Sequence, residues 1–195
     1  MRLQVVGCEV LARQLYYIAA LSPHVIDIEL LAKGLHNEPD TLRAEVQRRV
    51  EAADPEVYDA VLLAYGLCSN SIVGVRHPQL QMVVPRAHDC ITLYLGSADR
   101  YAEEFRTHPG TYWYAPDYME RNTKGTDDTV GLGSAGDDDE VSKTYEEYVA
   151  KYGQDNADYL MEVMGAWKAH YDRAAYIDTA DMPLPDYSGR AQEVA

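Results

Sequence analysis

The sequence of 195 residues has no long hydrophobic run. No stretch approaches the roughly 18 consecutive apolar residues that a membrane-spanning helix needs. The first residues, Met1 to Cys8, predict a strand, and they lack the apolar segment and cleavage site of a secretory signal. We therefore expect no membrane association and a cytoplasmic location.

Basic residues are also few. The chain carries 17 Lys and Arg against 32 Asp and Glu, which gives a formal net charge of −15. A polyanion is repelled by such a surface, so we expect no nucleic-acid partner. Acidic residues are concentrated in residues 126–140, whereas the segments that contain cysteine are nearly neutral. The charge is therefore mostly a property of the solvated surface.

Nucleotide-binding patterns are missing. The turn from Tyr65 to Asn70 contains a glycine but lacks the Gly-x-x-x-x-Gly-Lys pattern of a P-loop, and no Gly-x-Gly-x-x-Gly follows the first predicted strand. A nucleotide site therefore has little support. The sequence also contains no internal repeat and no domain linker, so its length favours one domain over residues 1–195.

Predicted strands alternate with predicted helices over most of the chain. The run Tyr58 to Tyr65 has a continuous apolar centre, which is typical of a strand covered on both faces. Asn37 to Asp40 begins a helix with capping residues and an early proline. The alternation predicts an α/β fold, a doubly wound three-layer sandwich with a mainly parallel sheet of about 4–6 strands and helices on both faces. Strands are expected at residues 2–7, 25–31, 58–65, 80–84, 111–115 and 174–178, and helices at 9–21, 37–53, 88–95, 99–106, 141–152 and 155–171.

Two segments depart from this alternation. Residues 120–140 combine Asp, Thr and Ser with several glycines, which predicts an acidic, flexible loop or lid. The tail at residues 181–195 is predicted to be mostly loop, with a helix that begins at Ser188. The chain is therefore either truncated or ends in a short helix.

The three cysteines, Cys8, Cys68 and Cys90, each follow a predicted strand. Their odd number does not suit a disulfide framework, and their spacing is not the Cys-x-x-Cys pattern of zinc ribbons. The carboxyl ends of parallel strands lie at one edge of a sheet, however, and ligands bind there in α/β proteins. We therefore expect the three thiols to converge. The alternative is that each is only a small buried hydrophobic residue.

Converging thiols suit a soft metal. Cys8, Cys68 and Cys90 can hold three irons of a 4Fe–4S cluster, which is the leading hypothesis, or a Zn²⁺ ion with water, His88 or substrate as its fourth ligand. Helix N-termini after the three turns are expected to lower the thiol pKa values and so to favour the thiolates.

Polar residues around the cysteines are candidates for binding and catalysis. Arg86 can bind a carboxylate or phosphate through two hydrogen bonds, and His88 can be an acid/base group, a metal ligand or a surface residue. Asp89 either caps the helix that follows it or binds the cofactor. A turn with backbone N–H groups and small polar side chains supplies the other predicted cofactor-binding residues. They are Tyr65, Gly66, Ser69 and Asn70.

Several of these segments together resemble the DUF1638 family, bacterial and archaeal proteins of unknown function. The segments are Val6 to Glu9, Ala64 to Asn70, Pro85 to Leu93, Pro109 to Tyr112 and Ala175 to Thr179. The combination of Tyr-Gly-Leu-Cys with Pro-Arg-x-His-Asp-Cys is specific, and the resemblance covers most of residues 1–180. Family members are often encoded near corrinoid-dependent methyltransferases. The resemblance therefore implies a link to one-carbon metabolism and a corrinoid protein or methyltransferase as partner.

We therefore expect a metal-binding protein, and the resemblance implies an enzyme of anaerobic one-carbon metabolism. It would be a metal-dependent methyltransferase or an Fe–S lyase-type enzyme, with a small-molecule substrate that is anionic or contains a thiol. Two other interpretations stay open. One is a non-catalytic accessory protein that delivers metal or binds a corrinoid, although the Asp-x-His-x-x-Gly pattern of corrinoid binding is missing. The other is a small-molecule binding domain with buried structural cysteines.

Overall fold

The protein is described by a computed structural model, in which the chain divides into two compact units. The first comprises residues 1–102 and 179–185, and the second residues 103–178 and 186–195. The prediction of a single domain over residues 1–195 stays a prediction, because compact units also occur within one domain. The structure describes residues 1–35, 38–121, 131–132, 149–150, 153–154, 172–179 and 182–194.

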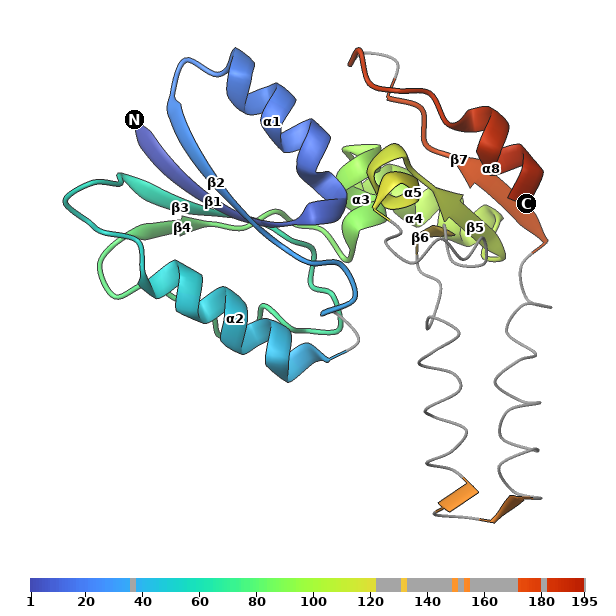
Figure 1. Ribbon diagram of the computed structural model, residues 1–195, viewed down its shortest axis with the longest axis horizontal. Coiled ribbons are helices and arrows are strands. Elements are labelled where there is room, and N and C mark those ends of the chain that lie inside the picture. The colour runs from blue at the N-terminus through green and yellow to red at the C-terminus, as the bar shows by residue number, and fades with distance from the viewer. Residues whose placement is uncertain are drawn as a thin grey trace. The chain divides into compact units, whose positions relative to one another are not determined.

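A parallel sheet forms the centre of the first unit (Figure 1). Its strand order is β2-β1-β3-β4, and every neighbouring pair is parallel. The α/β fold with a mainly parallel sheet is therefore confirmed. The strands are β1 (Arg2–Cys8), β2 (Val25–Leu31), β3 (Ala60–Ala64) and β4 (Gln81–Val83).

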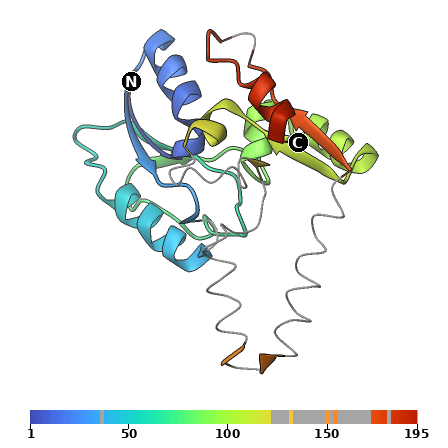
Figure 2. The same cartoon turned by 45° about the vertical axis from the view of Figure 1, so that its right-hand side comes forward.

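Helices lie on both faces of this sheet, as the two views of Figures 1 and 2 show. On one face, Val46 of α2 belongs to the same core cluster as Val6 of β1 and Val61 of β3. On the other face, Leu15 of α1 lies against Gly7 of β1. The helices in this part of the chain are η1 (Glu9–Leu11, a 3₁₀ helix), α1 (Ala12–Leu21), α2 (Pro39–Glu51), α3 (Cys90–Leu95) and α4 (Ala98–Thr107).

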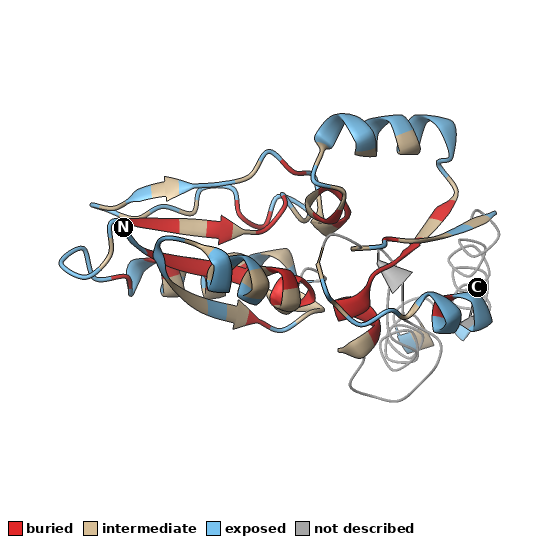
Figure 3. Ribbon diagram, turned by 90° about the horizontal axis from the view of Figure 1, so that it is seen from above, coloured by how far each residue is buried: buried red, intermediate tan, exposed pale blue. Residues whose placement is uncertain are grey.

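The two central strands carry the most deeply buried residues of the sheet (Figure 3). Val6 of β1 and Val61 of β3 are fully enclosed, whereas Val25 of β2 and Val83 of β4 are 58% and 50% exposed. The core therefore lies around β1 and β3, the strands that lead toward Cys8 and Cys68.

Local sequence accounts for the ends of two helices. Pro39 stands at the start of α2, where its fixed φ suits a helix and its missing N–H is not needed. Asp89 caps α3, because its side chain accepts a hydrogen bond from Thr92 N at 3.0 Å. Gly96 ends α3 with a φ of 66°, a left-handed conformation that glycine adopts without strain.

The second unit contains a separate sheet with the order β6-β5-β7. The strands predicted at residues 111–115 and 174–178 both form, and they pair with each other in parallel instead of joining the first sheet. Tyr114, Met119 and Ala191 form a core cluster in this unit. Its elements are β5 (Thr111–Tyr114), α5 (Pro116–Glu120), β6 (Gly131–Leu132), β7 (Arg173–Tyr176) and α8 (Ser188–Val194).

Several predicted features fall outside the described residues. They include most of the acidic loop at 120–140, most of the predicted helix at 141–152 and all of the one at 155–171. The helix predicted to begin at Ser188 is present as α8. No helix in the described ranges is long and apolar enough to cross a membrane.

Candidate functional site

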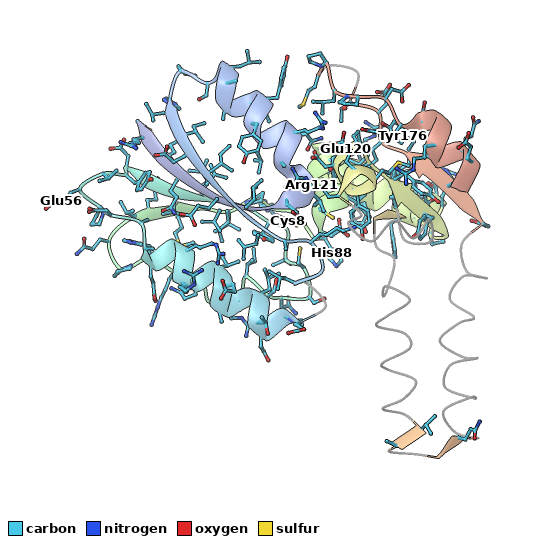
Figure 4. The ribbon with its side chains drawn as sticks, in the orientation of Figure 1. Cys8, Glu56, His88, Glu120, Arg121 and Tyr176 are labelled. Carbon is cyan, nitrogen blue, oxygen red and sulfur yellow. The ribbon has the colours of Figure 1, made fainter. Side chains whose placement is uncertain are left out.

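The three cysteines follow three adjacent strands at the carboxyl edge of the parallel sheet. Cys8 is the last residue of β1, Cys68 follows β3, and Cys90 begins α3 after β4. The strand order reverses between β1 and β3, which is the place where open α/β sheets bind ligands. Figure 4 shows Cys8 and His88 at this edge. The structure thus gives the position of the three cysteines, whereas their role as metal ligands stays a prediction.

Two of the turns at this edge are joined through their backbones. Leu67 N donates to Ala87 O at 3.0 Å, and Cys68 N donates to His88 O at 3.1 Å. These two hydrogen bonds continue the pairing of β3 and β4 beyond the ends of the strands. The turn that carries Cys68 is therefore tied to the segment immediately before Cys90.

Gly66 makes the closest contact between these two turns. A Cβ at this position would lie 2.5 Å from the Cα and 2.6 Å from the N of Asp89. Any side chain would meet that backbone, so only glycine fits. We predicted Gly66 as a cofactor-binding residue, and that role stays a prediction. The structure shows a packing role, which holds the Cys68 turn against the start of α3.

The turn that contains Cys68 has an unusual backbone. Three successive residues other than glycine have positive φ: Cys68 at 42°, Ser69 at 58° and Asn70 at 63°. The left-handed conformation costs roughly 1 kcal/mol or more for each such residue, so the surrounding structure must hold it in place. One such contact is the hydrogen bond from Arg43 Nη2 to Asn70 O, at 3.1 Å. The chain is therefore held in a strained conformation at a residue that carries a thiol.

The Cys8 turn is fixed to its neighbours on two sides. The hydroxyl of Tyr94, on α3, donates to the carbonyl oxygen of Val10, on η1. Glu9, which follows Cys8, accepts a hydrogen bond from Lys33 N at 2.7 Å. The end of β1 is thus tied both to the segment after β2 and to the helix whose first residue is the third cysteine.

Cys68 and Cys90 both have raised thiol pKa values. Burial raises the pKa of Cys90 well above its usual range, and the charges of Cys8, Asp89 and Cys68 raise it further. Burial, followed by the charge of Asp89, raises the pKa of Cys68 to about 11. Cys8 and Cys68 therefore lie close enough to Cys90 for a charge on either of them to affect its pKa. None of the three is in a disulfide.

The expectation that helix N-termini lower the thiol pKa values is wrong for Cys68 and Cys90. Backbone hydrogen bonds do lower both pKa values, but the burial of each thiol has the larger effect in the opposite direction. Removing a thiolate from water costs more than the backbone N–H groups recover. Without a metal, these cysteines are therefore protonated thiols.

Alkylation of Cys68 in the metal-free protein is expected to accelerate up to about pH 11 instead of levelling off near pH 9, because the reagent attacks the thiolate. A pKa of about 11 leaves roughly 0.1% thiolate at pH 8, against about a quarter for a free cysteine. Mass spectrometry of the Cys68 peptide after iodoacetamide treatment measures this dependence. The urea-unfolded chain is the control, and a native profile that levels off with it would contradict the raised pKa.

Both carboxylate oxygens of Asp89 are engaged within the protein. Oδ1 accepts hydrogen bonds from the N and Oγ1 of Thr92, at 3.0 and 3.2 Å. Oδ2 accepts one from the hydroxyl of Tyr101 at 2.8 Å and lies 3.0 Å from Nδ1 of His88. The capping interpretation of Asp89 is therefore confirmed, while its role in cofactor binding stays a prediction.

His88 lies on the surface, and two neighbours orient it. Its side chain is 76% exposed. The ring stacks on that of Tyr101, with centroids 6.2 Å apart, and Nδ1 bonds to Asp89. A proton on Nδ1 in that bond leaves Nε2 as the nitrogen that can exchange a proton with a substrate. Tyr101 was not predicted, because only the turn between α3 and α4 brings it to Asp89.

Arg86, Ser69 and Asn70 are exposed in the turns after β3 and β4. Within the part of the chain that the structure describes, Arg86 makes no ion pair. An exposed guanidinium group can bind an anion through two hydrogen bonds.

Tyr65 lies buried at this edge of the sheet. It is 3% exposed, and its hydroxyl has no hydrogen-bond partner among the described residues. Burial raises its pKa, and negative charge at Cys8 or Cys68 raises it further. The phenol therefore stays neutral and acts as a hydrogen-bond donor.

The three thiols are not arranged as metal ligands in this structure. Over the described residues, no three His, Cys, Asp or Glu side chains are arranged to hold a metal ion. Two observations nevertheless fit a metal bound by thiolates. A charge on Cys8 or Cys68 affects the pKa of Cys90, and the nearby Tyr65 hydroxyl has no hydrogen-bond partner among the described residues. A cysteine side chain has one rotatable bond with three staggered positions, so rotation alone can bring the sulfurs closer.

Comparison with known proteins identifies the family of the chain. The family described as Protein of unknown function (DUF1638) matches residues 30–195. This range contains Cys68 and Cys90, and Cys8 lies outside it. No curated protein and no solved structure matches the chain. The family match confirms the resemblance found in the sequence: the chain belongs to the DUF1638 family.

Proposed function

We propose that this chain binds a soft metal through Cys8, Cys68 and Cys90 and binds a small-molecule substrate at the open coordination position. The observation that carries the proposal is that three cysteines follow three adjacent parallel strands at one edge of the sheet, where a charge on Cys8 or Cys68 affects the pKa of Cys90. Thiolates are the usual ligands of zinc and of Fe–S clusters. Three of them leave one position of a tetrahedral zinc, or one iron of a 4Fe–4S cluster, without a protein ligand.

The raised thiol pKa values favour this proposal over a metal-free cysteine nucleophile. A catalytic cysteine needs a lowered pKa, because its thiolate is the reactive form. Burial has the opposite effect on Cys68 and Cys90. A bound metal removes this difficulty, since a coordinated thiol loses its proton. Burial disfavours thiolates in the metal-free protein. It is therefore compatible with a site whose cysteines become thiolates only when they bind the metal.

His88 and Arg86 supply the polar groups in this proposal. His88, held by Asp89 and stacked on Tyr101, moves protons to or from the substrate. Arg86 orients an anionic group of the substrate. The proposed reaction is that of a metal-dependent methyltransferase or an Fe–S lyase-type enzyme.

The proposed setting is one-carbon metabolism in the reducing cytoplasm, where cysteines remain thiols. The family resemblance supports this setting by association, and a corrinoid protein or methyltransferase is the proposed partner. A 4Fe–4S cluster is the leading identity of the metal, and Zn²⁺ is the alternative.

Metal analysis of the anaerobically purified chain tests the proposal. Brown protein that contains iron and acid-labile sulfide supports a cluster. Colourless protein with about one zinc per chain supports a zinc–thiolate site. Protein with neither metal would contradict the proposal and leave the small-molecule binding domain as the better interpretation.

Cysteine variants show whether the metal is held at the proposed site. Cys8→Ser, Cys68→Ser and Cys90→Ser are each expected to lower the bound metal at least about tenfold, because each removes a ligand. Ala60→Ser is the matched control, since it places a buried hydroxyl at the amino end of β3, far along the strand from the cysteines. Circular dichroism checks that each variant folds. Metal retained by all three cysteine variants would rule out the site.

A further inference from the structure

A buried hydroxyl without a partner stands beside the cysteines. Tyr65 directly follows β3 and is 3% exposed. Its hydroxyl makes no hydrogen bond to any residue that the structure describes. A buried polar group without a partner costs free energy, so a native protein that keeps one calls for an explanation. A ligand that completes the hydrogen bond is one such explanation.

The surroundings of Tyr65 show where such a ligand would lie. Tyr65 belongs to the core cluster against which Cys8 and Cys68 pack. Among the chargeable side chains near Tyr65, these two cysteines act on it most strongly. Its hydroxyl bonds to neither sulfur, however. The donor is therefore close to two of the proposed metal ligands and is not used by them.

We propose that Tyr65 donates a hydrogen bond to an anionic donor atom of the substrate, bound at the open coordination position of the metal. The inference rests on the metal centre proposed above. Three thiolates already place negative charge around the metal, so a further anionic ligand gains from a nearby donor. Arg86 is exposed and serves the outer part of the substrate, whereas Tyr65 is enclosed near the sulfurs. The substrate class is thus a small molecule that coordinates through a thiolate sulfur or a carboxylate oxygen.

Cobalt(II), added anaerobically to the metal-free chain, provides the probe. Its sulfur-to-cobalt absorption reports metal binding and changes again when a fourth ligand binds. The cobalt-loaded wild type, Tyr65→Phe and Tyr58→Phe are titrated with 2-mercaptoethanol in one arm and with acetate in the other, and Cys68→Ser tests the metal site itself. Tyr58→Phe is the matched control, because it removes a hydroxyl that bonds to Asp27 in the region before β3.

We expect Tyr65→Phe to bind cobalt within about threefold of wild type and to bind the anion roughly tenfold or more weakly, the effect of losing one charge-assisted hydrogen bond. Tyr58→Phe should bind both like wild type. If Tyr65→Phe loses affinity for mercaptoethanol alone, the substrate coordinates through a thiolate. If it loses affinity for acetate alone, the substrate coordinates through an oxygen. If it loses affinity for both, Tyr65 recognises the negative charge that the two anions share. Tyr65→Phe should melt at the wild-type temperature or above it, since an unpartnered hydroxyl is removed.

Equal anion affinity in Tyr65→Phe and wild type would overturn the inference and leave the metal centre in place. The same holds if wild type binds neither anion. It also holds if Tyr65→Phe loses affinity only for cobalt, because Tyr65 would then serve the cysteine thiolates. Wild type that binds no cobalt would overturn the inference, and if it also carries no iron or zinc when purified anaerobically it would overturn the metal centre as well. Cys68→Ser that still binds cobalt would overturn both.

Discussion

Gly66→Ala is expected to destabilise the protein by roughly 3 kcal/mol, which lowers the melting temperature by about 6–12 °C. The added Cβ would lie 2.5, 2.6 and 2.8 Å from the Cα, N and C of Asp89. All three are backbone atoms, so no side chain can rotate away and the two turns must separate. Separation breaks the hydrogen bond from Leu67 N to Ala87 O. Chemical and thermal denaturation measure the loss of stability.

Gly74→Ala is the control for Gly66→Ala. Gly74 has a φ of +85°, and a Cβ there would meet nothing within 4 Å. The substitution therefore costs only the left-handed preference of glycine, roughly 1 kcal/mol. Gly66 does not have a positive φ, so any loss beyond that of Gly74→Ala comes from the contact with Asp89. If both variants lose the same stability, that contact does not hold the turns together.

Metal binding by the same variants links stability to the proposed site. Gly66→Ala displaces the turn that carries Cys68, so it should also lower the bound metal at least about tenfold, as the loss of a well-placed ligand does. Gly74→Ala should keep the metal, because it leaves that contact intact. A stable, metal-loaded Gly66→Ala protein would contradict both expectations.

Asp89→Ala is expected to destabilise the protein by about 2 kcal/mol. The loss of the α3 cap accounts for about half of this, because Oδ1 no longer accepts from the N and Oγ1 of Thr92. The loss of the hydrogen bond from the Tyr101 hydroxyl to Oδ2 accounts for the rest. His88 loses the group that orients its ring in the same step. Denaturation in urea measures the change.

Asp89→Asn separates capping from the other roles of this carboxylate. Asparagine caps helices as well as aspartate does, so only the contacts of Oδ2 should be lost, at about 1 kcal/mol. We expect this variant to keep its metal, since Asp89 is engaged with Thr92 and Tyr101. Loss of metal from a folded Asp89→Asn protein would instead assign Asp89 to cofactor binding. Stability equal to that of Asp89→Ala would show that the cap contributes little.

Features whose signals lie in neighbouring residues can be predicted from the sequence. Alternation of apolar residues placed the strand at Val25–Leu31, and Pro39 marked the first turn of α2. Asp89 was recognised as a possible cap from its position before a helical pattern. The position of the cysteines at one edge followed from a general rule, because parallel strands end on the same side. Each of these depends on neighbours in the chain or on a rule that holds for every parallel sheet.

Features that depend on contacts between distant parts of the chain become known from the folded structure. The strands at Thr111–Tyr114 and Arg173–Tyr176 pair with each other, and strand propensity does not encode a partner. The direction of the Cys68 pKa shift was predicted wrongly, because burial outweighed the backbone N–H groups. The contact of Gly66 with Asp89 joins residues from two turns. Tyr65 is a predicted site residue, but the packing of its neighbours decides that its hydroxyl has no hydrogen-bond partner among the described residues. Burial and pairing are properties of the whole packed unit, so no local pattern contains them.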